Sequence, residues 1–190
     1  MPAPTTPVGP GDPAPDSSLV NTDGHLEMLS TGWRERPAAL VFLRYFGCPI
    51  CRQQVIRIRV DRERFERAGM EVVLIGHGSL EDGRRFAEER GVPYRLLVDP
   101  TRAAYERYGL TTGTLMQVFG PQCVAPMVRA ALQPGCRQGL PHGGNLMQMP
   151  GAFVVDTDGV VLLAHRSATI ADTPTTEQLL SALGGARRAA

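Results

Sequence analysis

The stretch Ala39-Leu-Val-Phe-Leu-Arg-Tyr-Phe-Gly-Cys-Pro-Ile-Cys51 joins a short apolar run to two closely spaced cysteines. The run from Ala39 to Leu43 has the composition of a strand that is buried on both faces. A turn follows at Gly47, and the residues after Cys51 have the spacing of a helix. We therefore expect a buried strand that delivers Cys48 and Cys51 to the first turn of a helix.

Cys48 has the local setting of a reactive thiol. Pro49 suits the first helical position, because its missing N–H would be unpaired there anyway. Cys48 then falls at the N-cap, where free N–H groups and the helix dipole favour a thiolate. Such a position can lower a thiol pKa from about 8.5 to roughly 3.5–7.5. Cys51 lies on the same helical face, within reach of a disulfide. Cys48 is predicted to attack because it is nearer the helix end, and Cys51 is predicted to resolve.

The composition indicates an ordinary globular protein. The chain has 190 residues, a net charge of +1, 43% hydrophobic and 21% charged residues. These values favour neither nucleic acid nor a membrane surface as a partner, and no apolar run approaches the about 18 residues of a membrane span. Residues 1–15 lack the pattern of a secretory signal and are predicted to be a flexible tail. Four cysteines without such a signal indicate a cytoplasmic protein with a redox or metal site.

The rest of the chain alternates strands and helices. After a hairpin turn at Asp23-Gly24, the pattern predicts helices over 49–68, 79–90, 99–108 and 175–183, and strands over 71–75, 94–98, 152–155 and 160–164. This order implies an α/β domain over 16–184 with parallel strands and right-handed crossovers. Residues 111–149 are rich in glycine and proline, and we expect a long inserted loop with one short helix over 124–132. Residues 185–190 are expected to fray.

The order of these features resembles the thioredoxin fold. A strand ends in CxxC at a helix start, a βαβ unit follows, and a proline precedes a β-hairpin and a last helix. Four segments narrow the resemblance to the peroxiredoxin-like branch of the alkyl hydroperoxide reductase/thiol-specific antioxidant family. They are the lead-in from Gly11 to Ser30, the block Phe42–Cys51, and the segments Met147–Asp156 and Ala164–Ser167.

The resemblance implies a thioredoxin-like fold in which Pro150 is the cis-proline that faces the cysteines. The backbone of Met149 would then be free to pair with a substrate or partner. The chain departs from true peroxiredoxins at two places and from thioredoxin at a third. The residues before Cys48 lack the Thr or Ser of the peroxide-binding loop, Gly151 replaces an arginine, and Phe42 replaces the buried acid of thioredoxin.

Two arginines are candidates to support the thiolate. Arg44 and Arg166 could each lower the pKa of Cys48 if they lie beside it, and the alternative for each is a structural arginine. His77, His142 and His165 lack a recognisable catalytic partner. A rival hypothesis is a zinc site built from Cys48, Cys51, Cys123 and Cys136, although Cys123 and Cys136 are not spaced as a tight pair.

The sequence therefore predicts a peroxiredoxin-like thiol oxidoreductase, an antioxidant enzyme that reduces a peroxide or a disulfide through Cys48 and Cys51. A thioredoxin-type reductant would restore the dithiol, and no cofactor is required. The alternative is a thioredoxin-fold binding or carrier module with non-catalytic cysteines. The substrate and the oligomeric state, including a homodimer, stay open.

Overall fold

The computed structural model describes residues 7–134, 136 and 144–189, with side chains to residue 184. The strands are β1 (Ser18–Asn21), β2 (Leu26–Met28), β3 (Ala38–Phe42), β4 (Glu71–Gly76), β5 (Arg95–Val98), β6 (Gly151–Val155) and β7 (Val161–Arg166). The helices are a 3-10 turn η1 (Leu29–Gly32), α1 (Pro49–Val60), α2 (Arg62–Ala68), α3 (Leu80–Arg90), α4 (Ala103–Arg107), α5 (Leu115–Phe119), α6 (Pro121–Leu132) and α7 (Thr176–Ala189). None of the described helices combines the length and the apolar character that a bilayer crossing requires.

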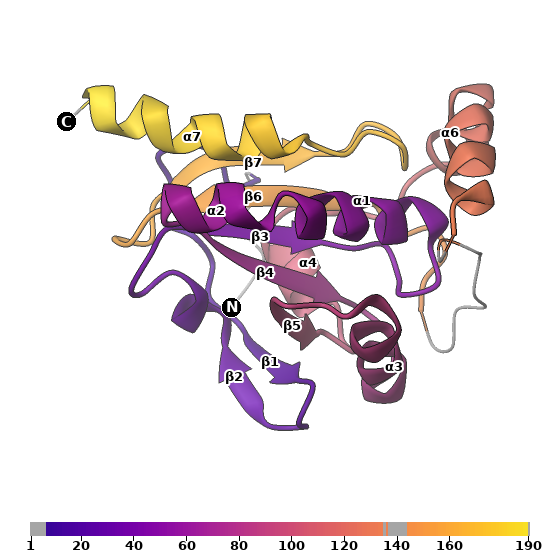
Figure 1. The fold of residues 1–190 in the computed structure, drawn as a ribbon, viewed down its shortest axis with the longest axis horizontal. Helices are drawn as coiled ribbons and strands as arrows, with labels where there is room; N and C mark the ends of the chain where they lie inside the picture. The colour runs from indigo at the N-terminus through magenta and orange to yellow at the C-terminus, as the bar shows by residue number, and fades with distance from the viewer. Residues whose placement is uncertain (1–6, 135, 137–143, 190) are drawn as a thin grey trace.

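The strands form one mixed sheet in the order β2-β1-β5-β4-β3-β6-β7 (Figure 1). β3 pairs in parallel with β4, and β4 pairs in parallel with β5. β6 pairs antiparallel with β3 on its other side, and β7 follows as the hairpin partner of β6. The predicted mixed sheet flanked by helices and preceded by an N-terminal hairpin is confirmed.

β3 is the centre of the core, and all five of its residues are buried. Its side chains alternate between two apolar layers, because successive residues of a strand point to opposite faces. Ala39 and Val41 contribute to the layer that contains Cys48, Cys51 and residues of α2, α3 and α7. Leu40 and Phe42 contribute to the layer that contains Tyr105 of α4 and Tyr108, which follows it.

The second layer is dominated by aromatic side chains. The Phe42 ring centroid lies 5.1 Å from that of Tyr105 and 4.9 Å from that of Tyr108. The hydroxyl of Tyr105 lies 2.6 Å from the carbonyl oxygen of Leu43 and 3.1 Å from that of Ile75. Tyr105 therefore ties together the carboxyl ends of β3 and β4, where the chain leaves the sheet toward Cys48.

Two predicted elements differ from the structure within the helical regions. The helix expected over 49–68 divides at Asp61, whose ψ of 12° separates α1 from α2. The loop expected over 111–149 contains two helices, because Thr114 and Gln117 form a capping box at the start of α5 and Pro121 occupies the first turn of α6. Figure 1 shows α6 standing apart from the sheet, beyond the first turn of α1. Residues 135 and 137–143 of the predicted loop lie outside the described residues.

The described residues at both ends of the chain make regular backbone contacts. The backbone N–H of Gly11 donates to the Val161 oxygen at 2.8 Å and that of Ala14 donates to the Gly159 oxygen at 2.7 Å, while the flexibility expected over 1–15 stays a prediction. Val8 is buried, and residues 1–6 lie outside the described residues. The last helix, α7, continues to Ala189, beyond the end predicted at 183, and the fraying expected over 185–190 stays a prediction. A glycine weakens a helix by about 1 kcal/mol but does not forbid it.

Candidate active site

Cys48 lies where the sequence predicts it, between β3 and α1. It occupies the N-cap of α1 with an extended backbone (φ −71°, ψ 121°), and Pro49 follows at the first helical position. The Cys48 N–H donates to the Tyr45 carbonyl oxygen at 3.1 Å, which closes the turn that connects the strand to the helix. The predicted strand-turn-helix delivery of the cysteines is confirmed.

The Cys48 sulfur lies against the first turn of α1 and against Arg44. Its side chain makes no capping hydrogen bond, but the backbone N–H of Cys51 in that turn is one of the groups that lower the pKa of Cys48, as the sequence predicts for a helix start. The sulfur is buried, and the Nη1 atom of Arg44 lies 3.6 Å from it. Arg44 is itself only 2% exposed. The predicted role of Arg44 as a neighbour of the thiolate is therefore supported by direct contact.

The pKa values of the two cysteine thiols are shifted in opposite directions. Burial alone would raise the pKa of Cys48, but the hydrogen bond from the Cys51 thiol and the positive charge of Arg44 outweigh burial and lower that pKa to about 6. Burial raises the pKa of Cys51 well above its ordinary value, and the neighbouring Cys48 adds to the increase. At neutral pH the site therefore holds one thiolate and one thiol, with Cys51 donating to Cys48.

Arg44 reaches the site through contacts that the sequence does not reveal. Its Nε atom donates to the Gln148 carbonyl oxygen at 3.2 Å, and its Nη2 atom donates to the carbonyl oxygen of Leu146. Its backbone N–H donates to the Cys51 sulfur at 3.3 Å. Arg44 therefore contacts both cysteines and the segment before Pro150. Sequence reasoning missed Leu146 and Gln148, since a carbonyl ligand about one hundred residues away leaves no local pattern.

The predicted geometry around Pro150 is wrong. All described peptide bonds are trans, including that between Met149 and Pro150. The Met149 N–H donates to the Thr111 oxygen at 3.1 Å, and its carbonyl oxygen accepts from the side chain of Gln148 at 3.2 Å. The Met149 backbone is thus occupied within the chain, in place of the free groups that the resemblance implied.

Arg166 lies on the other face of the sheet from Cys48. It pairs with Gly151 in the β6–β7 register, and the space beside Gly151 is filled by Leu110 of the second apolar layer. Its Nε atom donates to the Tyr108 carbonyl oxygen at 3.0 Å, and its Nη2 atom donates to that of Val8. Its side chain is thus structural, the alternative that the sequence left open, and the structure gives no support to a role at the thiolate.

His77 lies at the end of β4 beside the Arg44 segment. Its Nδ1 atom accepts a hydrogen bond from the Asn145 N–H at 3.4 Å, and its ring packs edge-on against Tyr105. Burial, with the positive charge of Arg102, lowers the pKa of His77 to about 4. The imidazole is therefore neutral at physiological pH and orders the segment that carries Leu146 and Gln148.

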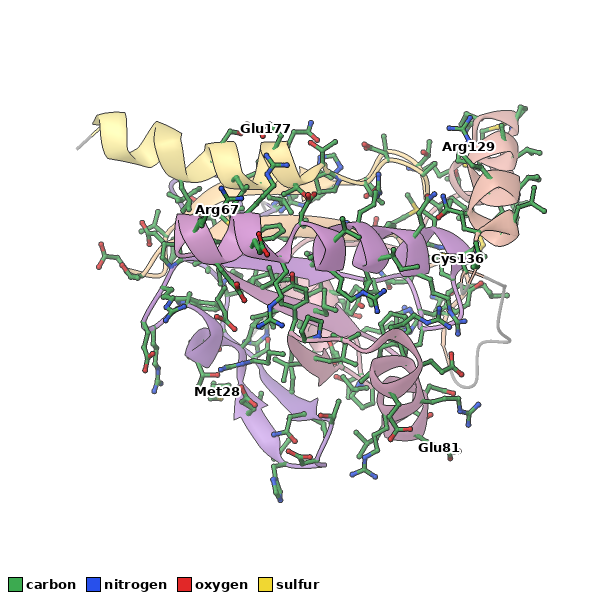
Figure 2. All side chains as sticks on the ribbon, viewed as in Figure 1. Met28, Arg67, Glu81, Arg129, Cys136 and Glu177 are labelled. Atoms are coloured by element: carbon green, nitrogen blue, oxygen red, sulfur yellow. The ribbon has the colours of Figure 1, made fainter. Side chains whose placement is uncertain are left out.

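The two remaining cysteines lie outside this arrangement. The Cys123 thiol donates to the Gln117 carbonyl oxygen at 3.3 Å. Figure 2 labels Cys136, which lies apart from the sheet. Burial raises the pKa of Cys136, while the positive charges of Arg90 and Arg52 act in the opposite direction. The described part of the chain contains no group of three or more metal-ligating side chains. His142 lies outside the described residues.

The chain is similar in sequence to one protein family and to several known proteins. The family model described as AhpC/TSA antioxidant enzyme matches residues 57–169, which begin just after the two cysteines. The chain is 24% identical over 188 residues to the thioredoxin-like protein AAED1 of Arabidopsis thaliana, covering 92% of this chain and 73% of that protein. It is 26% identical over 167 residues to a prostamide/prostaglandin F synthase of Danio rerio, covering 86% and 82%.

A solved structure supports the same fold. The peroxidoxin BcpB of Mycobacterium tuberculosis superposes with a TM-score of 0.69 at 22% identity, over 94% of this chain and 97% of that one. The predicted thioredoxin-like fold is confirmed. The family match favours an oxidoreductase enzyme over the binding or carrier module. The chain belongs to the AhpC/TSA antioxidant enzyme family.

Proposed function

We propose that this enzyme reduces peroxides with Cys48 as the attacking thiolate and Cys51 as the resolving thiol. The observation that carries the proposal is the buried contact of 3.6 Å between the Arg44 guanidinium and the Cys48 sulfur. No carboxylate among the described residues pairs with Arg44. The thiolate is therefore its counterion, and a buried charge requires one.

The reaction proceeds in two oxidative steps. The Cys48 thiolate attacks one peroxide oxygen, an S–O bond forms, the O–O bond breaks, and the second oxygen leaves as an alcohol or water after taking a proton. The Cys51 sulfur then attacks the Cys48 sulfenic acid, an S–S bond forms, and water leaves. A dithiol donor of thioredoxin type returns two electrons through a mixed disulfide and restores both thiols.

The electrostatics of the pair fit this order. The negative charge of Cys48 contributes to the raised pKa of Cys51, while the Arg44 backbone and charge act in the opposite direction. When Cys48 becomes a sulfenic acid, its charge is lost and Arg44 stays in place. The pKa of Cys51 then falls, so the resolving thiol becomes nucleophilic after the first step and not before it.

The burial of Cys48 favours a small substrate. Its side chain has no exposed surface, so a peroxide fits the site better than the disulfide of a folded protein. Hydrogen peroxide and an alkyl hydroperoxide are the first substrates to test. An endoperoxide is a further one, because the Danio rerio relative is named for prostaglandin F synthesis.

Intact-mass analysis of reduced protein treated with one equivalent of hydrogen peroxide tests the proposal. The wild type should lose two hydrogens, and Cys51→Ser should instead gain one oxygen at Cys48. Cys48→Ser should show neither change, whereas Cys123→Ser should behave as the wild type. The proposal is wrong if Cys48→Ser consumes peroxide at the wild-type rate. A small disulfide reagent that reacts faster than every peroxide would favour disulfide reduction.

We also propose that the enzyme works in a reducing compartment such as the cytoplasm. The proposed cycle requires Cys48 and Cys51 to return to the dithiol state, and a reducing compartment maintains thiols in that state. Such a compartment would also supply the dithiol donor.

A further inference from the structure

Gln148 is a buried amide whose nitrogen and oxygen atoms both have hydrogen-bond partners. It is 1% exposed and directly precedes the Met149–Pro150 bond. Its Nε2 atom lies within hydrogen-bond distance of three carbonyl oxygens, those of Leu110 (3.0 Å), Thr111 (3.3 Å) and Met149 (3.2 Å). Its Oε1 atom accepts from Arg102 at 3.4 Å. The side chain thus fixes its own segment against the chain between α4 and α5.

The same segment holds the Arg44 guanidinium. Nε of Arg44 donates to the Gln148 carbonyl oxygen at 3.2 Å, and Nη2 donates to that of Leu146. The remaining nitrogen, Nη1, faces the Cys48 sulfur at 3.6 Å. Because a guanidinium is a rigid planar fork, fixing two of its nitrogens fixes the direction of the third.

Arg102 adds a second anchor for Gln148. It has a φ of 63°, and no other non-glycine residue in the described part of the chain has a positive φ. The left-handed conformation is unfavourable for a residue with a Cβ atom, and it persists where the surroundings enforce it. Here the strained backbone begins α4, and the guanidinium of Arg102 ends on the Gln148 amide oxygen.

We propose that Gln148 is a positioning residue for the reactive cysteine. Its side-chain amide holds the 146–148 carbonyl groups in place, these hold Arg44, and Arg44 holds the Cys48 thiolate. The proposal rests on the proposed function, in which the Cys48 thiolate is the attacking group. It adds to the site a residue that contacts Arg44 but has no contact with either cysteine sulfur.

The test is the pH dependence of Cys48 alkylation in Gln148→Leu. Each variant is treated with iodoacetamide at a series of pH values, and modification of Cys48 is located by fragmentation of the peptide that also carries Cys51. Leucine keeps most of the side-chain volume and removes every amide contact. Gln117→Leu is the matched control, because it also loses amide contacts, to Thr114 and Ala168, without reaching Arg44.

We expect the midpoint of Cys48 alkylation to rise by at least about one pH unit in Gln148→Leu and to stay unchanged in Gln117→Leu. If Gln148→Leu does not fold, Arg102→Lys keeps the positive charge near His77 but loses the planar guanidinium that ends on Oε1, and it should give a smaller rise in the same direction. An unchanged midpoint in the folded variants, with a lower melting temperature alone, would overturn the positioning role. A wild-type midpoint near that of an ordinary thiol would overturn the proposed function as well, so the two failures are distinguishable.

Discussion

Replacing Arg44 by methionine tests the electrostatic account of the site most directly. Methionine fills similar apolar volume and removes both the charge and the Nη1 contact to the Cys48 sulfur. An opposite charge at this range lowers a thiol pKa by about 1–3 units. Taking two units, the pKa of Cys48 should rise from about 6 in the wild type to about 8 in Arg44→Met.

The expected rates follow from two opposing effects. At pH 7 a two-unit rise reduces the thiolate fraction about tenfold, while a Brønsted slope of about 0.45 makes the remaining thiolate about eightfold more nucleophilic. The alkylation rates of the two proteins should therefore be nearly equal at pH 7. At pH 5 Arg44→Met should react about tenfold more slowly, and at pH 9 several-fold faster, so the two pH profiles should cross.

The assay measures iodoacetamide modification of Cys48 by mass spectrometry from pH 4 to pH 10. Arg166→Met is the matched control, because Arg166 is also a partly buried arginine bound to carbonyl oxygens but lies on the opposite face of the sheet. Parallel profiles for wild type and Arg44→Met would refute the role of Arg44. An equal shift in Arg166→Met would show that the effect is not local.

Three further predictions concern stability. The lowered pKa of Cys48 should stabilise the fold fully above the ordinary thiol pKa, and this stabilisation, on the order of 3 kcal/mol, should be lost as pH falls through about 6. Urea unfolding of Cys48→Ser should lack this dependence. The lowered pKa of His77 should contribute about 3 kcal/mol that is present above about 6.5 and lost as pH falls through about 4, and His77→Gln should remove that slope alone. Tyr105→Phe should lower the unfolding free energy by about 1–3 kcal/mol, because two buried carbonyl groups lose their shared donor. Tyr108→Phe should change it little, because the Tyr108 hydroxyl has no hydrogen-bond partner among the described residues; equal losses in the two tyrosine variants would contradict this reasoning.

The parts of the site that the sequence predicts correctly depend on neighbouring residues. An apolar run, a turn glycine and Pro49 lie within fifteen residues, and together they specify the strand, the turn and the helix start that hold Cys48. The βαβ order follows in the same way from local patterns. Arg44 is close enough in sequence to Cys48 that its proximity could be inferred.

The incorrect or missing predictions concern contacts between residues that are far apart in the sequence. Arg166 pairs with Gly151 in the register of β6 and β7, so both residues lie on the same face of the sheet. That register cannot be predicted from neighbouring residues. Gln148 acts through carbonyl and amide groups, which carry no residue-specific signature. The cis-proline came from the resemblance alone, and the hydrogen bond from Met149 to Thr111 could not be read from a sequence.

The amino-terminal segment also serves as a cover for an exposed sheet edge. β7 is the last strand of the sheet, and residues 8–14 run beside it from the side chain of Arg166 to the carbonyl group of Gly159. An open edge strand is a template for pairing with another molecule. A chain cut to begin at Ser17 would keep both cysteines and the whole sheet, yet it would present β7 to its neighbours and become prone to aggregation.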